Sequence, residues 1–179
     1  LEINRNSGSF LYGMIDETAI GMGGHSLGGL STISLIGGHP DNQVKDDRIK
    51  AALLLSSPIY PFDTNLDNIS IPLMTMTGEY DVLITQPDSS WGYHRDLLTV
   101  PNYYLVLKDA HHFTFSSAAC DNYSTIQQCQ YGNQQVNTIE DYSLAFFNYY
   151  LKNDSAMLAK LTNADDAMLM AYEWRNVPD

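Results

Sequence analysis

Apolar residues fall in short blocks along the first two thirds of the chain, bounded by glycine, proline, serine or charged residues. Four of these blocks span 19–22, 49–55, 71–77 and 103–107. Short, nearly continuous apolar runs are typical of strands buried on both faces of a parallel sheet. Between them, segments 30–36 and 88–98 have the pattern of helices. This order of elements predicts an α/β fold built on a parallel sheet.

The last third of the chain has apolar residues at helical spacing. The segment 138–153 predicts an amphipathic helix whose wide aromatic face packs in the core, and Thr138 and the acids that follow suit its N-terminus. We expect a second helix over 155–175. No internal repeat or linker divides the chain, so residues 1–179 are expected to form a single domain.

The composition narrows the class of protein. With 179 residues, of which 44% are hydrophobic, the chain can fill a core. Nine Lys and Arg against 21 Asp and Glu give a formal net charge of -12, which disfavours nucleic acids and anionic membrane surfaces as partners. The apolar runs are much shorter than the ~20 residues that cross a bilayer, so we expect no membrane span.

Two cysteines, Cys120 and Cys129, lie in a segment rich in Gln, Asn, Ser and Tyr. A small loop closed by a disulfide is the favoured interpretation, and two free thiols are the alternative. Metal sites usually need more Cys and His at close spacing, so no metal is expected. A disulfide would indicate an oxidising compartment, and hence a secreted or periplasmic protein.

The segment Gly24-His25-Ser26-Leu27-Gly28 fits the pattern G-x-S-x-G and lies between a predicted strand and a predicted helix. In that context the pattern predicts a nucleophile elbow, a strained turn that exposes the serine hydroxyl above the sheet. We expect both outer glycines to be required, because a side chain at either would collide with the strand or the helix. The backbone N–H of Leu27 would point toward a developing oxyanion. A structural glycine-rich turn is the alternative, and a phosphate loop is disfavoured because no Lys follows.

A serine nucleophile needs a base, and the base needs a carboxylate that orients it. Asp81 follows the third predicted strand and His112 follows the fourth. Both would lie at the carboxyl edge of the sheet, where open α/β sheets gather their active sites. Glu79 is the alternative acid, although its position nearer the strand suits a loop anchor. His111 is the alternative base.

The other histidines, His25, His39 and His94, are expected to be bystanders. His25 lies beside Ser26, where packing or support of the site explains it at least as well as catalysis does.

Three aromatic residues, Tyr60, Trp91 and Phe113, fall in segments expected near the carboxyl edge of the sheet. They are candidates for lining a substrate pocket, with ordinary packing as the alternative.

These segments resemble α/β-hydrolases, in particular bacterial esterases of the dienelactone-hydrolase-like and platelet-activating-factor-acetylhydrolase-like types and their polyester-hydrolase relatives. The likeness is carried by 16–29 around the elbow, by 71–81, and by Ala110-His111-His112-Phe113-Thr114-Phe115. In the family pattern the acid falls on Asp81 and the histidine on His112. The resemblance covers about residues 10–150.

The resemblance implies hydrolysis of a carboxylic ester, small or polymeric, through an acyl-enzyme and without a metal or organic cofactor. Ser26 would attack the carbonyl, His112 would transfer the proton, Asp81 would orient His112, and Leu27 N–H would bind the oxyanion. A polyester or amide hydrolase with the same triad is one alternative. A non-catalytic α/β-hydrolase-like binding protein is another.

The chain departs from the family pattern at its start, because the family's strands before the elbow strand have no counterpart in it. We therefore expect residues 1–179 to be the C-terminal part of an α/β-hydrolase. The missing strands, and with them the second oxyanion donor, would come from a second chain or an additional segment.

Overall fold

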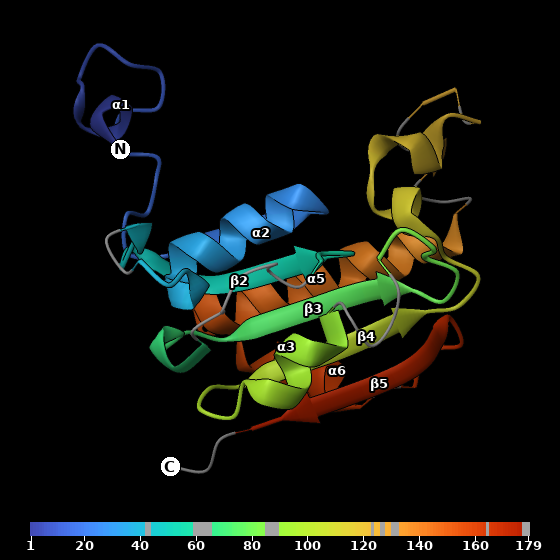
Figure 1. Ribbon diagram of the computed structural model, residues 1–179. Coiled ribbons are helices and arrows are strands. Elements are labelled where there is room, and N and C mark those ends of the chain that lie inside the picture. The colour runs from blue at the N-terminus through green and yellow to red at the C-terminus, as the bar shows by residue number, and fades with distance from the viewer. Residues whose placement is uncertain are drawn as a thin grey trace.

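The computed structural model describes residues 1–41, 44–58, 66–84, 90–122, 124–125, 128–129, 133–163 and 165–176. These residues form a five-stranded sheet with helices on both faces, which confirms the predicted α/β fold (Figure 1). Among the helices of these ranges, none combines the length and apolar character that a bilayer crossing requires.

The strands lie in the sheet in the order β1-β2-β3-β4-β5, the same as their order in the chain. Their bounds are Ile20–His25, Ile49–Leu55, Leu73–Gly78, Asn102–Leu107 and Leu169–Arg175. β1 to β4 are parallel, and β5 pairs with β4 in the antiparallel direction. The first four strands therefore end at one edge of the sheet, where the predicted site residues follow them.

The predicted helix over 155–175 is wrong in its second half. A 3-10 turn at Ser155–Met157 and the short helix α6, Leu158–Thr162, are followed by strand β5. The Asp166 carboxylate accepts a hydrogen bond from the Met168 backbone N–H at 3.0 Å, which makes a turn before the strand. Aromatic residues of the segment, such as Tyr172, then pair along β4.

Helices cover the sheet on two sides. α2 (Leu27–Ile33), which runs on through a π-helical turn at Ser34–Gly38, and α3 (Ser90–Asp96) pack on one face. α5 (Gln134–Lys152) crosses the other face, with α6 packed beside it (Figure 1). α5 begins one turn before the predicted Thr138, because the Asn133 side chain accepts a hydrogen bond from Val136 N–H. The remaining elements are α1 (Glu2–Arg5) and 3-10 turns at Leu66–Asn68, His112–Phe115 and Ser117–Cys120.

Alternate residues of the strands fill two separate cores. Leu53, Met76 and Leu105 face α5 and pack with its buried Tyr142 and Phe146. The second core lies on the opposite face, between the sheet and the segments of α2 and α3. It contains the strand residues Ala52, Leu54 and Leu73, and the residues Ile33, Ile36, Tyr93 and Leu97, which lie in those helical segments or directly after them. A sheet buried on both faces is a rigid platform, so the loops at its carboxyl edge start from fixed positions.

β1 lies at one border of the sheet. Within the described ranges, its backbone pairs with β2 alone. A groove of 860 Å³ lies along it, lined mainly by apolar side chains that include Ile20, Leu144, Phe147 and Leu151.

Candidate active site

Three segments that carry the predicted site residues meet at the carboxyl edge of the sheet. Ser26 follows β1 directly, Asp81 follows β3 by three residues, and His112 follows β4 by five. β1 and β4 lie three positions apart in the sheet, so residues far apart in sequence are brought to one edge.

Ser26 lies in a strained turn between β1 and α2. Its backbone has φ 54° and ψ -122°, which a residue with a side chain rarely adopts. The conformation is held on both sides, because Ser26 N–H donates to Leu55 O at 2.9 Å and Gly29 N–H donates to Ser26 O at 2.8 Å. Leu27 begins α2, so its N–H is among the helix N-terminal groups that lack an intrahelical acceptor. This geometry is that of a nucleophile elbow.

The sequence predicted that a side chain at either Gly24 or Gly28 would collide with its surroundings, and the structure confirms this for only one of the two. A Cβ at Gly24 would lie 2.1 Å from Gly28 O, so a side chain is excluded there. A Cβ at Gly28 would meet nothing within 4 Å, so the expected collision at that position is wrong. Gly29 is the second glycine that the packing requires, since a Cβ there would lie 2.3 Å from the Ser57 hydroxyl oxygen.

Asp81 and His112 form a buried pair. His112 Nδ1 lies 2.9 Å from Asp81 Oδ2, and both side chains are almost fully shielded from solvent. The other carboxylate oxygen, Oδ1, accepts hydrogen bonds from the backbone N–H groups of Leu83 and Ile84 at 3.0 and 2.9 Å. Asp81 therefore holds a fixed orientation and engages the ring nitrogen of His112 that faces away from a nucleophile.

The carboxylate of Asp81 stays ionised despite its burial. Burial raises the pKa of Asp81 and is the largest single effect, but hydrogen bonds, first those from His112 and Ile84 N–H, together with the charge of His112 bring the pKa below its ordinary value. The hydroxyl of Ser56 is buried near Asp81 and lowers its pKa further. Its distance or angle does not meet the criteria of a full hydrogen bond to any described residue. An ionised partner is what a histidine base requires.

The loops that carry Asp81 and His112 are packed directly against each other. A Cβ at Gly78 would lie 2.5 Å from Ala110 O, so only glycine allows this approach. Tyr80 N–H donates to Ala110 O at 2.8 Å. Glu79, the alternative acid, accepts a hydrogen bond from Asp109 N–H at 3.0 Å and so anchors the two loops.

The structure brings Ser26 to the same edge as the Asp81–His112 pair, but it records no hydrogen bond between the Ser26 hydroxyl and His112 among the described residues. The second ring nitrogen of His112, Nε2, does not take part in the contact with Asp81. Contacts between a serine and its base are often long before a substrate binds.

His25 is the residue whose place at the site the sequence did not settle. Its Nε2 lies 2.9 Å from the backbone O of His112, and the two rings are 4.6 Å apart. Of the other histidines, His94 is buried beside Tyr104 on the face covered by α3. His39 lies at the end of the π-helical turn that follows α2.

The three predicted pocket residues have different outcomes. Tyr60 lies outside the described residues. Trp91 lies on α3 with the Arg95 guanidinium 5.3 Å from its ring, and no contact with Ser26, Asp81 or His112 is recorded. Phe113 is half-exposed, with its ring edge-on to His112 at 5.4 Å.

Exposed apolar side chains adjoin each of the three site residues in sequence. They are Leu27 beside Ser26, Val82 and Leu83 beside Asp81, and Phe113 beside His112, with exposed fractions of 71%, 81%, 61% and 52%. The sequence did not single out Val82 and Leu83, since single apolar residues in a loop carry no strong signal. These exposed apolar side chains are candidates for contact with a ligand.

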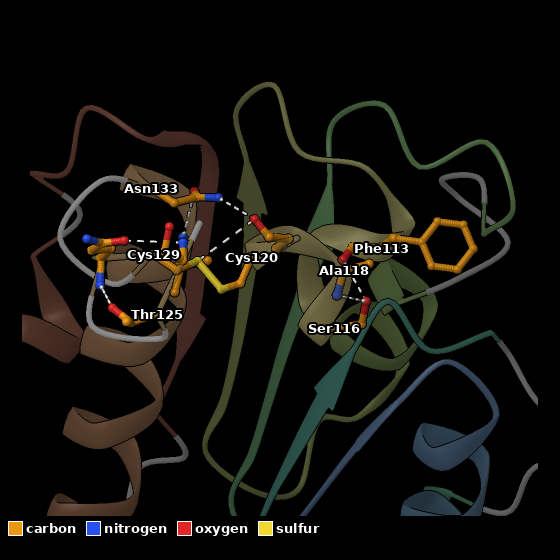
Figure 2. The surroundings of a disulfide bond; sticks show 11 residues. Phe113, Ser116, Ala118, Cys120, Thr125, Cys129 and Asn133 are labelled. Carbon is orange, nitrogen blue, oxygen red and sulfur yellow. Dashed lines mark hydrogen bonds between the residues drawn. A yellow bond between two sulfur atoms is a disulfide. The ribbon is translucent and has the colours of Figure 1, made fainter. Parts of the chain in front are cut away.

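The predicted disulfide is present between Cys120 and Cys129, with Cα atoms 5.3 Å apart. It ties the end of the segment that follows His112 to residues near the start of α5 (Figure 2). The same junction is held by the Asn133 side-chain amide, which donates to Ala119 O at 3.3 Å. The Phe113 ring points away from the disulfide (Figure 2). In the described ranges, no group of three or more His, Cys, Asp or Glu side chains is placed to hold a metal ion.

A parallel sheet whose strand-to-helix elbow carries Ser26 defines the chain as an α/β-hydrolase. Comparison with protein families agrees with this class: the family PETase, described as PET hydrolase-like, matches residues 1–156. The chain belongs to this family, which places it among the ester hydrolases. A search of curated proteins gave no match.

Proposed function

We propose that the protein is a serine hydrolase that cleaves carboxylic esters through an acyl-enzyme, with Ser26, His112 and Asp81 as its triad. The observation that carries the proposal is the buried hydrogen bond between His112 Nδ1 and Asp81 Oδ2, at the sheet edge where the elbow exposes Ser26. A protein that only binds a ligand has no need of an ionised, buried carboxylate behind a histidine.

The reaction follows from this arrangement. His112 Nε2 takes the proton of Ser26 as the hydroxyl oxygen attacks the ester carbonyl, and the imidazolium that forms is stabilised by Asp81. Collapse of the tetrahedral intermediate breaks the ester C–O bond, and His112 returns the proton to the departing alcohol. A water molecule, deprotonated by His112, then attacks the acyl-enzyme and releases the acid.

The negative oxygen of each tetrahedral intermediate needs hydrogen-bond donors. Leu27 N–H is the candidate on this chain, because it is the first N–H of α2 and follows the nucleophile directly. The dipole of α2 adds a small favourable field at the same place.

The substrate is proposed to be an ester with a large apolar part, small or polymeric. Leu27, Val82, Leu83 and Phe113 support this class, because these exposed apolar residues directly adjoin the three triad residues in sequence. The family description supports a polyester in particular. An amide substrate has no such support among the described residues.

The Cys120–Cys129 disulfide supports an exported protein, either secreted or periplasmic, because disulfides persist in oxidising compartments.

The open border of β1 and the apolar groove beside it support a further proposal, that a strand from another segment or a second chain completes the sheet. Residues 1–179 would then be the C-terminal part of a larger α/β-hydrolase domain, and the added part would supply a second oxyanion donor.

The test is hydrolysis of p-nitrophenyl acetate and longer p-nitrophenyl esters by the wild type, Ser26→Ala and Ser31→Ala. Ser31 is a matched control, since it lies exposed on α2. Turnover by the wild type and Ser31→Ala that is lost in a folded Ser26→Ala supports the proposal. Equal turnover by Ser26→Ala would contradict it. A folded wild type without turnover would mean either that the added part is needed for activity or that the protein only binds its ligand.

A further inference from the structure

His25 immediately precedes the proposed nucleophile and contacts the loop of the proposed base. Its Nε2 lies 2.9 Å from the backbone carbonyl oxygen of His112, a residue 87 positions later in the chain. The two imidazole rings lie 4.6 Å apart at an angle of 44°, and the ring of Phe115 lies 6.4 Å from that of His25. His25 is therefore held between the elbow and the His112 loop by a hydrogen bond and by ring contacts.

We propose that His25 is a positioning residue, whose Nε2–H holds the main chain of His112 and thereby sets the distance between the base and Ser26. The inference rests on the proposed function, because it assigns the positioning role within that same triad. Catalysis itself stays with Ser26, His112 and Asp81.

The hydrogen bond defines the tautomer of His25. A carbonyl oxygen can only accept, so His25 Nε2 must carry the proton that is donated. Burial lowers the pKa of His25, and the nearby His112 lowers it further, while the hydrogen bond to His112 O acts in the opposite direction. The ring is therefore neutral, with its one proton on Nε2, in the pH range where a histidine base works.

A neutral ring is also what the reaction requires at this position. The groups that face His25 are His112 and, at longer range, Asp81. When His112 becomes an imidazolium during turnover, a second positive charge next to it would oppose that step. A neutral donor can hold the loop without this cost.

The contact joins the elbow after β1 to the loop after β4, two parts of the site that start from strands that are not neighbours in the sheet. His112 is held from one side by Asp81, and its loop is held by the contact of Ala110 O with Tyr80 N–H and by His111 N–H, which donates to Thr114 Oγ1 at 3.0 Å. None of these contacts reaches β1, whereas the His25 bond does. Because His25 and Ser26 are adjacent, this bond is a direct structural link between the elbow and the base. A displacement of 1 Å at such a site costs on the order of 10²-fold in rate.

The experiment compares wild type, His25→Leu, His25→Gln and, as a histidine control away from the site, His39→Gln. Leu removes the donor and keeps bulk, whereas the amide nitrogen of Gln can replace Nε2–H without a titratable ring. The readouts are kcat and KM on p-nitrophenyl acetate, the rate of labelling by a fluorophosphonate, and the melting temperature. In the wild type, ¹⁵N NMR of the histidine side chains also reports the His25 tautomer.

We expect His25→Leu to lose roughly 10- to 100-fold in kcat and labelling rate with little change in KM. His25→Gln should recover most of the loss, and His39→Gln should match the wild type. The NMR spectrum should show neutral His25 with the proton on Nε2.

The inference is overturned if a folded His25→Leu reacts like the wild type, if His25→Gln is as slow as His25→Leu, or if the proton is on Nδ1. Because the NMR spectrum is that of the wild type, it shows whether His25 Nε2 carries the donated proton even where a variant fails to fold. A wild type that takes no label contradicts the proposed function instead, so the two failures are distinguishable.

Discussion

The two outer glycines of the elbow motif should respond in opposite ways to the same substitution. Gly24→Ala adds a Cβ that would lie 2.1 Å from Gly28 O and 2.7 Å from Gly29 N. Gly28→Ala adds a Cβ with no atom within 4 Å. The substitutions are chemically identical and four residues apart, so each is a control for the other.

The magnitude follows from these distances. Ordinary contacts begin at 3.4 Å, so the Gly24→Ala backbone must separate by more than 1 Å from the start of α2. Overpacking against backbone costs about 1–3 kcal/mol, and a shift of this size beside the nucleophile costs on the order of 10²-fold in rate. Gly28 has no positive φ and lies in α2, so Gly28→Ala should stabilise the protein by about 0.5–1 kcal/mol.

The assay is p-nitrophenyl acetate hydrolysis together with thermal unfolding for both variants. We expect Gly24→Ala to lose most activity and to melt lower by roughly 2–4 °C for each kcal/mol of destabilisation. Gly28→Ala should keep its activity and melt at or above the wild-type temperature. Equal losses in the two variants, or an unaffected Gly24→Ala, would refute this account of the elbow.

Three further predictions concern the base, the pH dependence of stability and the disulfide. Asp81→Asn should lower kcat by about 10⁴-fold, because the asparagine no longer stabilises the imidazolium of His112; steady-state kinetics on a folded variant measures this, and a loss below tenfold would contradict the role of Asp81. Burial, and next the charge of Arg175, lower the pKa of His94 in the folded protein. At a pH below about 6.5 the unfolded chain therefore binds more protons than the folded one, and the free energy of unfolding should fall as the pH drops. His94→Phe, which keeps a ring against Tyr104, should flatten this decline in denaturant unfolding at pH 5 to 8, and an unchanged slope would show that His94 does not cause it. Removing the Cys120–Cys129 bridge with Ser at both positions should cost about 3 kcal/mol, as expected for a loop of this length; calorimetry checks it, and an unchanged melting temperature would contradict a stabilising bridge.

The sequence predicted the parallel part of the fold well, because buried strands and the elbow have strong local signals. β2 was predicted with the bounds that the structure has. The antiparallel strand β5 was missed, since residues such as Leu169 and Tyr172 fit a helical pattern as well as a strand. The segment becomes a strand because it pairs with β4. This pairing is a long-range interaction, so the local spacing of apolar residues does not predict it.

The candidate site was predictable where chain order and strand ends define it. Asp81 lies further past the end of the third strand than Glu79 does. That position predicted that Asp81, and not Glu79, would be the partner of His112, as the structure shows. The contact of His25 with His112 O and the close approach of Gly78 to Ala110 were not predictable. Both depend on how two loops from different strands pack, and no spacing along the chain encodes that distance.

The most direct test of the central claim is to treat the wild-type protein with a fluorophosphonate and locate the adduct by mass spectrometry of its peptides. The account predicts one adduct, on Ser26, and none after the same treatment of Ser26→Ala. An adduct on a different serine, or none on a folded protein, would contradict the assignment of Ser26 as the nucleophile.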